Sequence, residues 1–97
     1  MKFIYITCNI SMVEILWDMI DEMEIMNYQT IDLVTAKSDY AQPRLNTAIW
    51  PGYNASILIQ EADNNKSDTL IKEIKEMNKN AFNSAEIVAV HSWKLDD

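Results

Sequence analysis

The sequence predicts an α+β fold, with a four-stranded antiparallel sheet, two helices on one of its faces and one long loop. Four runs rich in β-branched and aromatic residues alternate with two helix-like segments in the order βαββαβ. The runs that begin at Phe3 and Ala55 are apolar on both faces, which is typical of central strands. The loop lies between the second and third strands. This pattern is ferredoxin-like, and residues 1–97 fit a single domain.

The first strand covers residues 3–8, and a helix follows it. Ser11 and Glu14 match a capping box, so the helix is expected to begin at Ser11 and to run to about Met26. Its apolar residues cover an arc of roughly 200°, where a surface helix needs little more than about 100°. This helix should therefore contact more than one neighbour. Either the second helix lies alongside it, or another subunit does.

The polar side of this helix carries acidic residues only. Two interpretations stay open for it. It is either a solvated face that aids solubility or a surface for a metal ion or a cationic partner. The residues concerned are Glu14, Asp18, Asp21, Glu22 and Glu24.

The remaining elements follow from their periodicity. A half-buried strand is expected over residues 30–35, with Ile31, Leu33 and Thr35 on its buried side. A central strand is expected over residues 54–60. A second helix capped by Ser67 should run to about Asn80. Phe82 should fold back onto the core before a last strand over residues 86–93.

The loop, residues 37–54, differs in composition from the rest of the chain. It contains Pro43 and Pro51, the only glycine, Gly52, and the only arginine, Arg44. A loop of this length within a compact domain is usually functional or disordered. The residues from Trp50 to Tyr53 fit a type II turn, with proline second and glycine third.

Four residues of this loop are candidates for binding a ligand or a partner. Arg44, expected at the loop tip, suits bidentate binding of a carboxylate or phosphate, although a solvated arginine is an equal alternative. Lys37, at the loop base, is a weaker candidate. Trp50 either contacts a partner or anchors the loop on the sheet. Tyr53 lies beside it in the predicted turn.

Composition excludes several classes of protein. The net charge is −7, and no Lys or Arg occurs between Phe3 and Ala36, so neither nucleic acid nor an anionic membrane surface is an expected partner. No apolar run approaches the roughly 18 residues of a membrane span, so no direct membrane insertion is expected. The single cysteine, Cys8, allows no intrachain disulfide, which fits a reducing cytoplasm.

Nothing in the sequence indicates catalysis, because no nucleophile motif or matched acid and base pair appears. We therefore expect no enzyme, and no cofactor is identified. His91 is the only histidine and is expected to be structural. The alternative is a metal site, with Cys8 and His91 as neighbours on paired first and last strands and Asp96 or Asp97 adding oxygen ligands.

Two stretches carry a resemblance to a known family. Residues 24–31 (EIMNYQTI) lead from the first helix into the second strand, and residues 50–54 (WPGYN) directly precede the third. With the long loop between these strands, the chain resembles the PII-like signal proteins, whose cousins are the CutA-type ion-tolerance proteins. The resemblance implies a cytoplasmic sensor, usually a homotrimer, whose mobile T-loop regulates a transporter or enzyme.

The resemblance also implies a small ligand, with an anion as one candidate, in the cleft between subunits. The best-known members bind adenine nucleotides through a glycine-rich loop before the last strand. The matching residues 80–86 contain no glycine and no lysine, so this chain departs from the pattern there. The alternatives are a CutA-type metal-handling protein that uses Cys8 and His91, and a purely structural subunit.

The sheet face opposite the helices needs a cover of its own. Phe3 and Tyr5 should point to that face, where no predicted element of the chain would bury them. At this chain length, another subunit would be the simplest cover. The sequence therefore predicts a homo-oligomer, and the family resemblance makes it a homotrimer.

Overall fold

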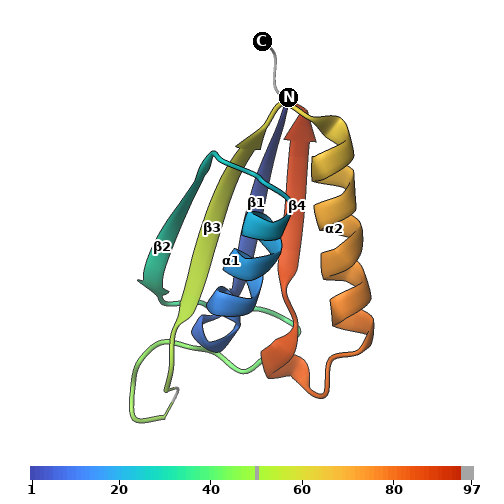
Figure 1. Ribbon diagram of the computed structural model, residues 1–97. Coiled ribbons are helices and arrows are strands. Elements are labelled where there is room, and N and C mark those ends of the chain that lie inside the picture. The colour runs from blue at the N-terminus through green and yellow to red at the C-terminus, as the bar shows by residue number, and fades with distance from the viewer. Residues whose placement is uncertain (50, 95–97) are drawn as a thin grey trace.

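The structure is a computed structural model that describes residues 1–49 and 51–94. One antiparallel sheet has the strand order β2-β3-β1-β4, and helices α1 (Val13–Glu22) and α2 (Asn64–Lys79) cover one of its faces (Figure 1). The predicted ferredoxin-like α+β fold is confirmed, with the two most apolar strands at the centre. The strands are β1 (Lys2–Asn9), β2 (Tyr28–Val34), β3 (Asn54–Glu61) and β4 (Ala89–Lys94).

The core lies between the helices and the helix-facing side of the sheet. Alternate residues of β1, Ile4 and Ile6, point to the helices and are fully buried, and their register partners on β3 are Ile59 and Ile57. A strand places successive side chains on opposite faces, so this alternation sorts β1 into a buried row and an outward row. The helices contribute Leu16, Ile20, Leu70 and Ile74 to the same core.

The start and the end of α1 both differ from the prediction. A short 3₁₀ turn, Ile10–Met12, precedes the helix, and Asn9 Oδ1 accepts a hydrogen bond from Ser11 N (3.1 Å). The predicted capping box with Glu14 is absent, and Met12 at the N-cap makes no side-chain cap bond.

The helix ends at Glu22 instead of Met26, because Glu24 adopts a left-handed conformation, with φ 58°. Ile25 N then donates to Ile20 O (3.2 Å), and the Ile25 side chain is buried. Such a six-residue closure with a buried apolar residue after it is a Schellman-type helix end. Met26 therefore leaves the helix surface and is exposed.

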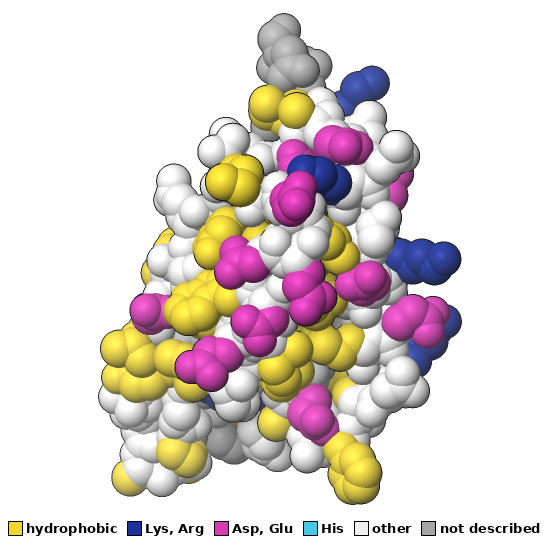
Figure 2. Space-filling model, in the orientation of Figure 1, with side chains coloured by type: hydrophobic (Ala, Val, Ile, Leu, Met, Phe, Trp, Pro, Cys, Tyr) yellow, Lys and Arg dark blue, Asp and Glu magenta, His cyan; other side chains and the backbone are white. Residues whose placement is uncertain are grey.

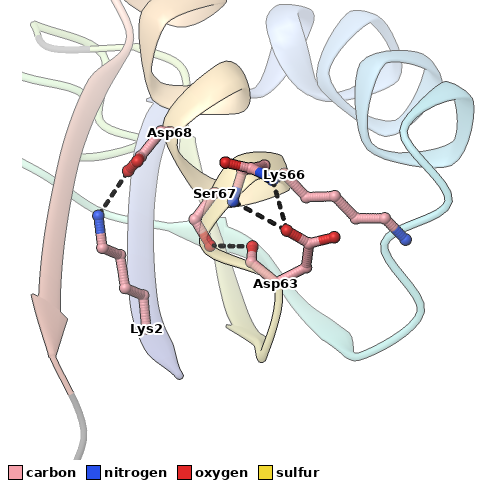
Figure 3. A network of polar contacts seen from close by, with 6 residues as sticks. Lys2, Asp63, Lys66, Ser67 and Asp68 are labelled. Atoms are coloured by element: carbon pink, nitrogen blue, oxygen red, sulfur yellow. Dashed lines mark hydrogen bonds and ion pairs between the residues drawn. The ribbon is translucent and has the colours of Figure 1, made fainter.

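The N-cap of helix α2 lies four residues before the predicted cap, Ser67. Asp63 is the N-cap, and its Oδ1 accepts from Asn65 N at 2.8 Å and from Lys66 N at 3.4 Å (Figure 3). Ser67 lies inside the first turn, where its hydroxyl donates to Asp63 O (3.3 Å). In the same network Asp68 pairs with Lys2 of β1. Asp63 and Ser67 are both good N-caps, so the sequence alone did not separate them.

Two of the predicted strands differ from the observed ones. Strand β2 runs from Tyr28 to Val34, and the three expected buried positions, Ile31, Leu33 and Thr35, are exposed. Trp17 Nε1 donates to Thr30 Oγ1 (2.9 Å), so the other side of β2 faces the helices.

Strand β4 begins only at Ala89, because a 3₁₀ turn closed by an Asn83–Glu86 capping box comes first. This turn holds Phe82 away from the core. Phe82 is 94% exposed, so the expectation that it would fold back was wrong.

The sheet face opposite the helices, called here the open face, is only partly covered. Near the β1 N-terminus the ring of Trp93 packs on Phe3, with 5.6 Å between ring centroids, and Trp93 stays half exposed. Ile31 is also half exposed. Within the described parts of the chain, no helix combines the length and apolar character needed to cross a membrane.

Candidate functional site

Residues 35–53 form the loop between β2 and β3, which extends beyond the ends of both strands (Figure 1). Main-chain hydrogen bonds close it at two levels. Ala36 and Arg44 exchange two N–H···O bonds of 2.8 Å, and Asn46 N donates to Gly52 O (3.1 Å). Gly52 has φ 90°, a left-handed value that glycine adopts without strain, while the predicted turn begins at Trp50, outside the described residues. These main-chain hydrogen bonds hold segments of the loop together near its base.

The sequence predicted that Arg44 would lie exposed at the loop tip, and this prediction was wrong. It is only 8% exposed, and its main chain forms the bridge to Ala36 at the loop base. Its Nη1 donates to Asn54 Oδ1 (2.7 Å), and Asn54 Nδ2 donates in turn to Thr7 Oγ1 (3.3 Å). The guanidinium is thereby tied to the first residue of β3 and, through it, to β1.

The loop covers part of the open face. Asn54 and Ser56 lie in the same row of β3 as the half-buried Leu58, yet both are almost completely buried. The Ser56 hydroxyl also has a hydrogen-bonding partner, because it lies 3.2 Å from the Tyr5 hydroxyl. Buried polar groups are stable only when hydrogen-bonded. One hydrogen-bonded chain of Arg44, Asn54 and Thr7 and one pair of Tyr5 and Ser56 therefore form a polar floor under the loop.

A cavity of about 370 Å³ opens beside this floor. Arg44 is one of its lining residues, with other loop residues and two residues of the turn before β4. Among the described residues, Arg44 forms no ion pair with a carboxylate. A guanidinium has five N–H donors, and the bond to Asn54 uses one of them. The lining residues are Gln42, Pro43, Arg44, Ile49, Pro51, Ser84 and Ala85.

Cys8 lies on the helix side of β1 and is buried. Burial raises the pKa of its thiol to about 11, against a smaller opposing effect of the Arg44 charge. The thiol is therefore protonated at neutral pH and a poor nucleophile or metal ligand.

The other predicted loop residues have separate positions. Lys37 is exposed, directly after the Ala36 bridge. Tyr53 is half-buried, and its carbonyl accepts from Ile10 N (3.2 Å), which joins the loop end to the turn before α1. No side-chain hydrogen bond joins either residue to Arg44 in the described parts of the chain. Trp50 lies outside the described residues.

The exposure of two apolar side chains was not predicted from the sequence. Ile49 of the loop is 79% exposed, and Phe82 of the turn before β4 is 94% exposed. Isolated exposed apolar residues are common, but Ile49 lines the cavity and Phe82 lies two residues before Ser84, which also lines it. An isoleucine between the two prolines of a polar loop was the available signal for Ile49.

The structure separates the two candidate metal ligands. His91 pairs in register with Tyr5, while Cys8 follows Thr7, the partner of Ala89. Odd and even positions of β1 point to opposite faces, so Cys8 faces the helices and His91 faces the open side. The expectation that they would be neighbours was wrong, and within residues 1–49 and 51–94 no group of three His, Cys, Asp or Glu suits a metal. Nothing here favours the CutA-type alternative.

Solved structures with a closely similar fold are PII-like proteins. One is CPII from Thiomonas intermedia K12, bound to ADP and bicarbonate, with a TM-score of 0.68 at 13% identity over 97% of this chain and 86% of that one. The apo form of CPII, described as a nitrogen regulatory PII-like protein, gives 0.64 at 14% identity over 97% and 89%. A PII-like signalling protein from Thermus thermophilus gives 0.67 at 11% identity over 95% and 83%.

Neither a protein-family model nor a curated protein sequence matches the chain. Identities of 11–14% carry the fold and not the ligand or the partner. The resemblance seen in residues 24–31 and 50–54 thus agrees with the structural neighbours at the level of the fold. This chain has the fold of the PII-like signalling proteins.

Proposed function

We propose that this chain is a cytoplasmic PII-like regulator without catalytic activity, which controls a transporter or enzyme through the loop of residues 35–53. One observation carries the proposal. The loop extends from the sheet with exposed Ile49, while its base is tied to two central strands through Arg44 and Asn54. A loop that is fixed at its base and apolar at its exposed part suits regulated contact with another protein.

The ligand of this regulator is a small anion that binds in the cavity beside Arg44. Arg44 is buried and forms no ion pair with a carboxylate of residues 1–49 or 51–94, which favours an anion, and its planar fork matches a carboxylate or bicarbonate group. CPII, which shares the fold, is bound to ADP and bicarbonate. Binding beside Arg44 would act directly on the loop base, where Arg44 bonds with Ala36 and Asn54.

The assembly is a homotrimer that buries the rest of the open face. Phe3, Trp93 and Ile31 leave apolar surface on this face of the single chain. Static light scattering at low micromolar concentration would give about three times the chain mass of 11.2 kDa. A stable monomer under these conditions would remove the trimer from the proposal.

The ligand is tested by calorimetric titration with bicarbonate, acetate and ADP, using three variants. Arg44→Ala removes the guanidinium and should abolish anion binding. Asn54→Ala removes the tether but keeps the guanidinium, so binding should persist although stability falls. Lys37→Ala changes an exposed cation of the same loop and serves as the control, with binding unchanged.

Comparing Arg44→Ala with Asn54→Ala separates the effect on anion binding from the effect on folding. Both variants destabilise the loop base, but only Arg44→Ala removes the guanidinium. Anion binding that survives in Arg44→Ala, or that is lost equally in both variants, contradicts the site. Loss of anion binding in Lys37→Ala alone would place the binding site on the outer surface of the loop.

A further inference from the structure

A row of apolar side chains lies on the helical face, between α1 and α2. We call Ile15 and Met19 of α1, Met77 of α2 and Val90 of β4 the interhelical strip. Ile15 is 47% exposed, and the other three are half-buried against the core. Both helices bury residues in the same core, yet Ile15 at the edge of this core stays 47% exposed.

The position of the strip follows from helix geometry. Trp17 contacts Thr30 on β2, and at 100° per residue Ile15 and Met19 lie on the opposite edge of α1. That edge faces α2, which lies toward the β4 side of the sheet (Figure 1). On α2, Met77 shares a side with Lys66, whose ammonium group donates to Glu24 O just after α1. Because Ile15 on this edge stays 47% exposed, the second helix does not bury the whole apolar arc of α1.

Carboxylates border the strip on both helices. On α1, Asp18 lies one turn after Ile15 and Glu22 lies one turn after Met19. On α2, Glu73 lies on the side toward α1. Figure 2 shows acidic side chains gathered around hydrophobic ones on this face. Like charges one turn apart repel, and acids near a helix C-terminus oppose its dipole. Within residues 1–49 and 51–94 none of these three carboxylates forms an ion pair.

We propose that the interhelical strip is the docking site for a cationic amphipathic helix of another protein. Such a helix would bury its apolar face on the strip, and its lysines or arginines would offset the bordering carboxylates. The described part of this chain supplies no such helix. Its lysine-bearing helix, α2, already packs its apolar side into the core. This site lies on the face opposite the polar floor and does not depend on the anion proposal.

The proposal is tested with a synthetic peptide of about 18 residues, long enough to span α2, with leucines and lysines at helical spacing. Fluorescence anisotropy of the labelled peptide measures the dissociation constant at two salt concentrations. Ile15→Ser should weaken binding about tenfold. Leu33→Ser, which changes an exposed apolar residue of β2, should leave it unchanged.

Charge is tested in the same way. The double variant Asp18→Asn, Glu22→Gln should weaken binding and reduce its salt dependence. The matched pair Asp32→Asn, Asp39→Asn, which changes exposed acids outside the helices, should do neither. A peptide of equal composition but without helical spacing should bind about tenfold less tightly.

Three results would overturn the docking site. One is absence of peptide binding up to about 100 µM. Another is equal weakening by both charge pairs, which would show nonspecific attraction to an acidic protein. The last is a change of oligomeric state on Ile15→Ser with peptide binding intact, which would assign the strip to a second copy of the chain.

Discussion

Replacement of Asn54 by alanine tests whether the loop base is held by the buried polar floor. Asn54 is 3% exposed and bridges two elements, because it accepts from Arg44 at 2.7 Å and donates to Thr7 at 3.3 Å. Asn54→Ala removes both bonds and leaves the buried guanidinium without this partner. Among the described residues, the loop and the two central strands then lose the side-chain link that runs through Arg44.

The expected loss follows from the two bonds. A hydrogen bond to a charged group contributes about 1.5–3 kcal/mol and a neutral one about 1 kcal/mol, so the free energy of unfolding should fall by about 3 kcal/mol. For a domain of this size, that corresponds to a fall in melting temperature of more than about 10 °C. Thr7→Val removes only the neutral bond and should cost about 1 kcal/mol.

Urea unfolding followed by circular dichroism measures these values for Asn54→Ala, Arg44→Ala and the double variant. Because the two side chains bond with each other, the double variant should cost less than the sum of the singles, with a coupling of about 1.5 kcal/mol or more. Additive effects, or a loss below about 0.5 kcal/mol for Asn54→Ala, would refute the tether.

Three further predictions concern the scaffold. Trp17→Phe keeps an aromatic ring but loses the bond to Thr30, and should lower the urea-unfolding free energy by about 1 kcal/mol. Asp63→Ala removes the α2 N-cap and should lower the urea-unfolding free energy by about 1 kcal/mol. An unchanged urea midpoint would show that the Asp63 cap does not stabilise α2. Because the pKa of Cys8 rises on folding from 9.0 to about 11, the stability linked to its protonated thiol is complete below about pH 9 and is lost as the pH rises through about 11. Cys8→Ala should flatten this decline, and parallel pH profiles of the two proteins would contradict it.

Element order and strand placement were predictable from the sequence. The strands from Phe3 and Ala55 carry apolar residues on both faces, and such runs are stable only where both faces are covered. Element boundaries were less predictable. Asp63 and Ser67 compete as caps of the same helix, and the left-handed Glu24 that ends α1 has no sequence signal of its own.

The candidate site was predicted in outline only. The composition of the loop identified Arg44, but its expected exposure at the tip was wrong. A single arginine in an acidic chain can extend into solvent or turn inward, and only the position of Asn54 at the start of β3 decides between them. The exposure of Phe82 likewise depends on the Asn83–Glu86 turn, which interrupts the expected path to the core.

The sequence by itself determined the ferredoxin-like fold, the core rows of β1 and β3 and the loop between β2 and β3, because apolar periodicity and turn residues act over short stretches of chain. The tertiary structure decided where Arg44 points, which part of the open face the loop covers, and that Cys8 and His91 lie on opposite faces. These depend on strand register and on the path of the loop, which bring together residues far apart in the sequence. No local pattern encodes that proximity.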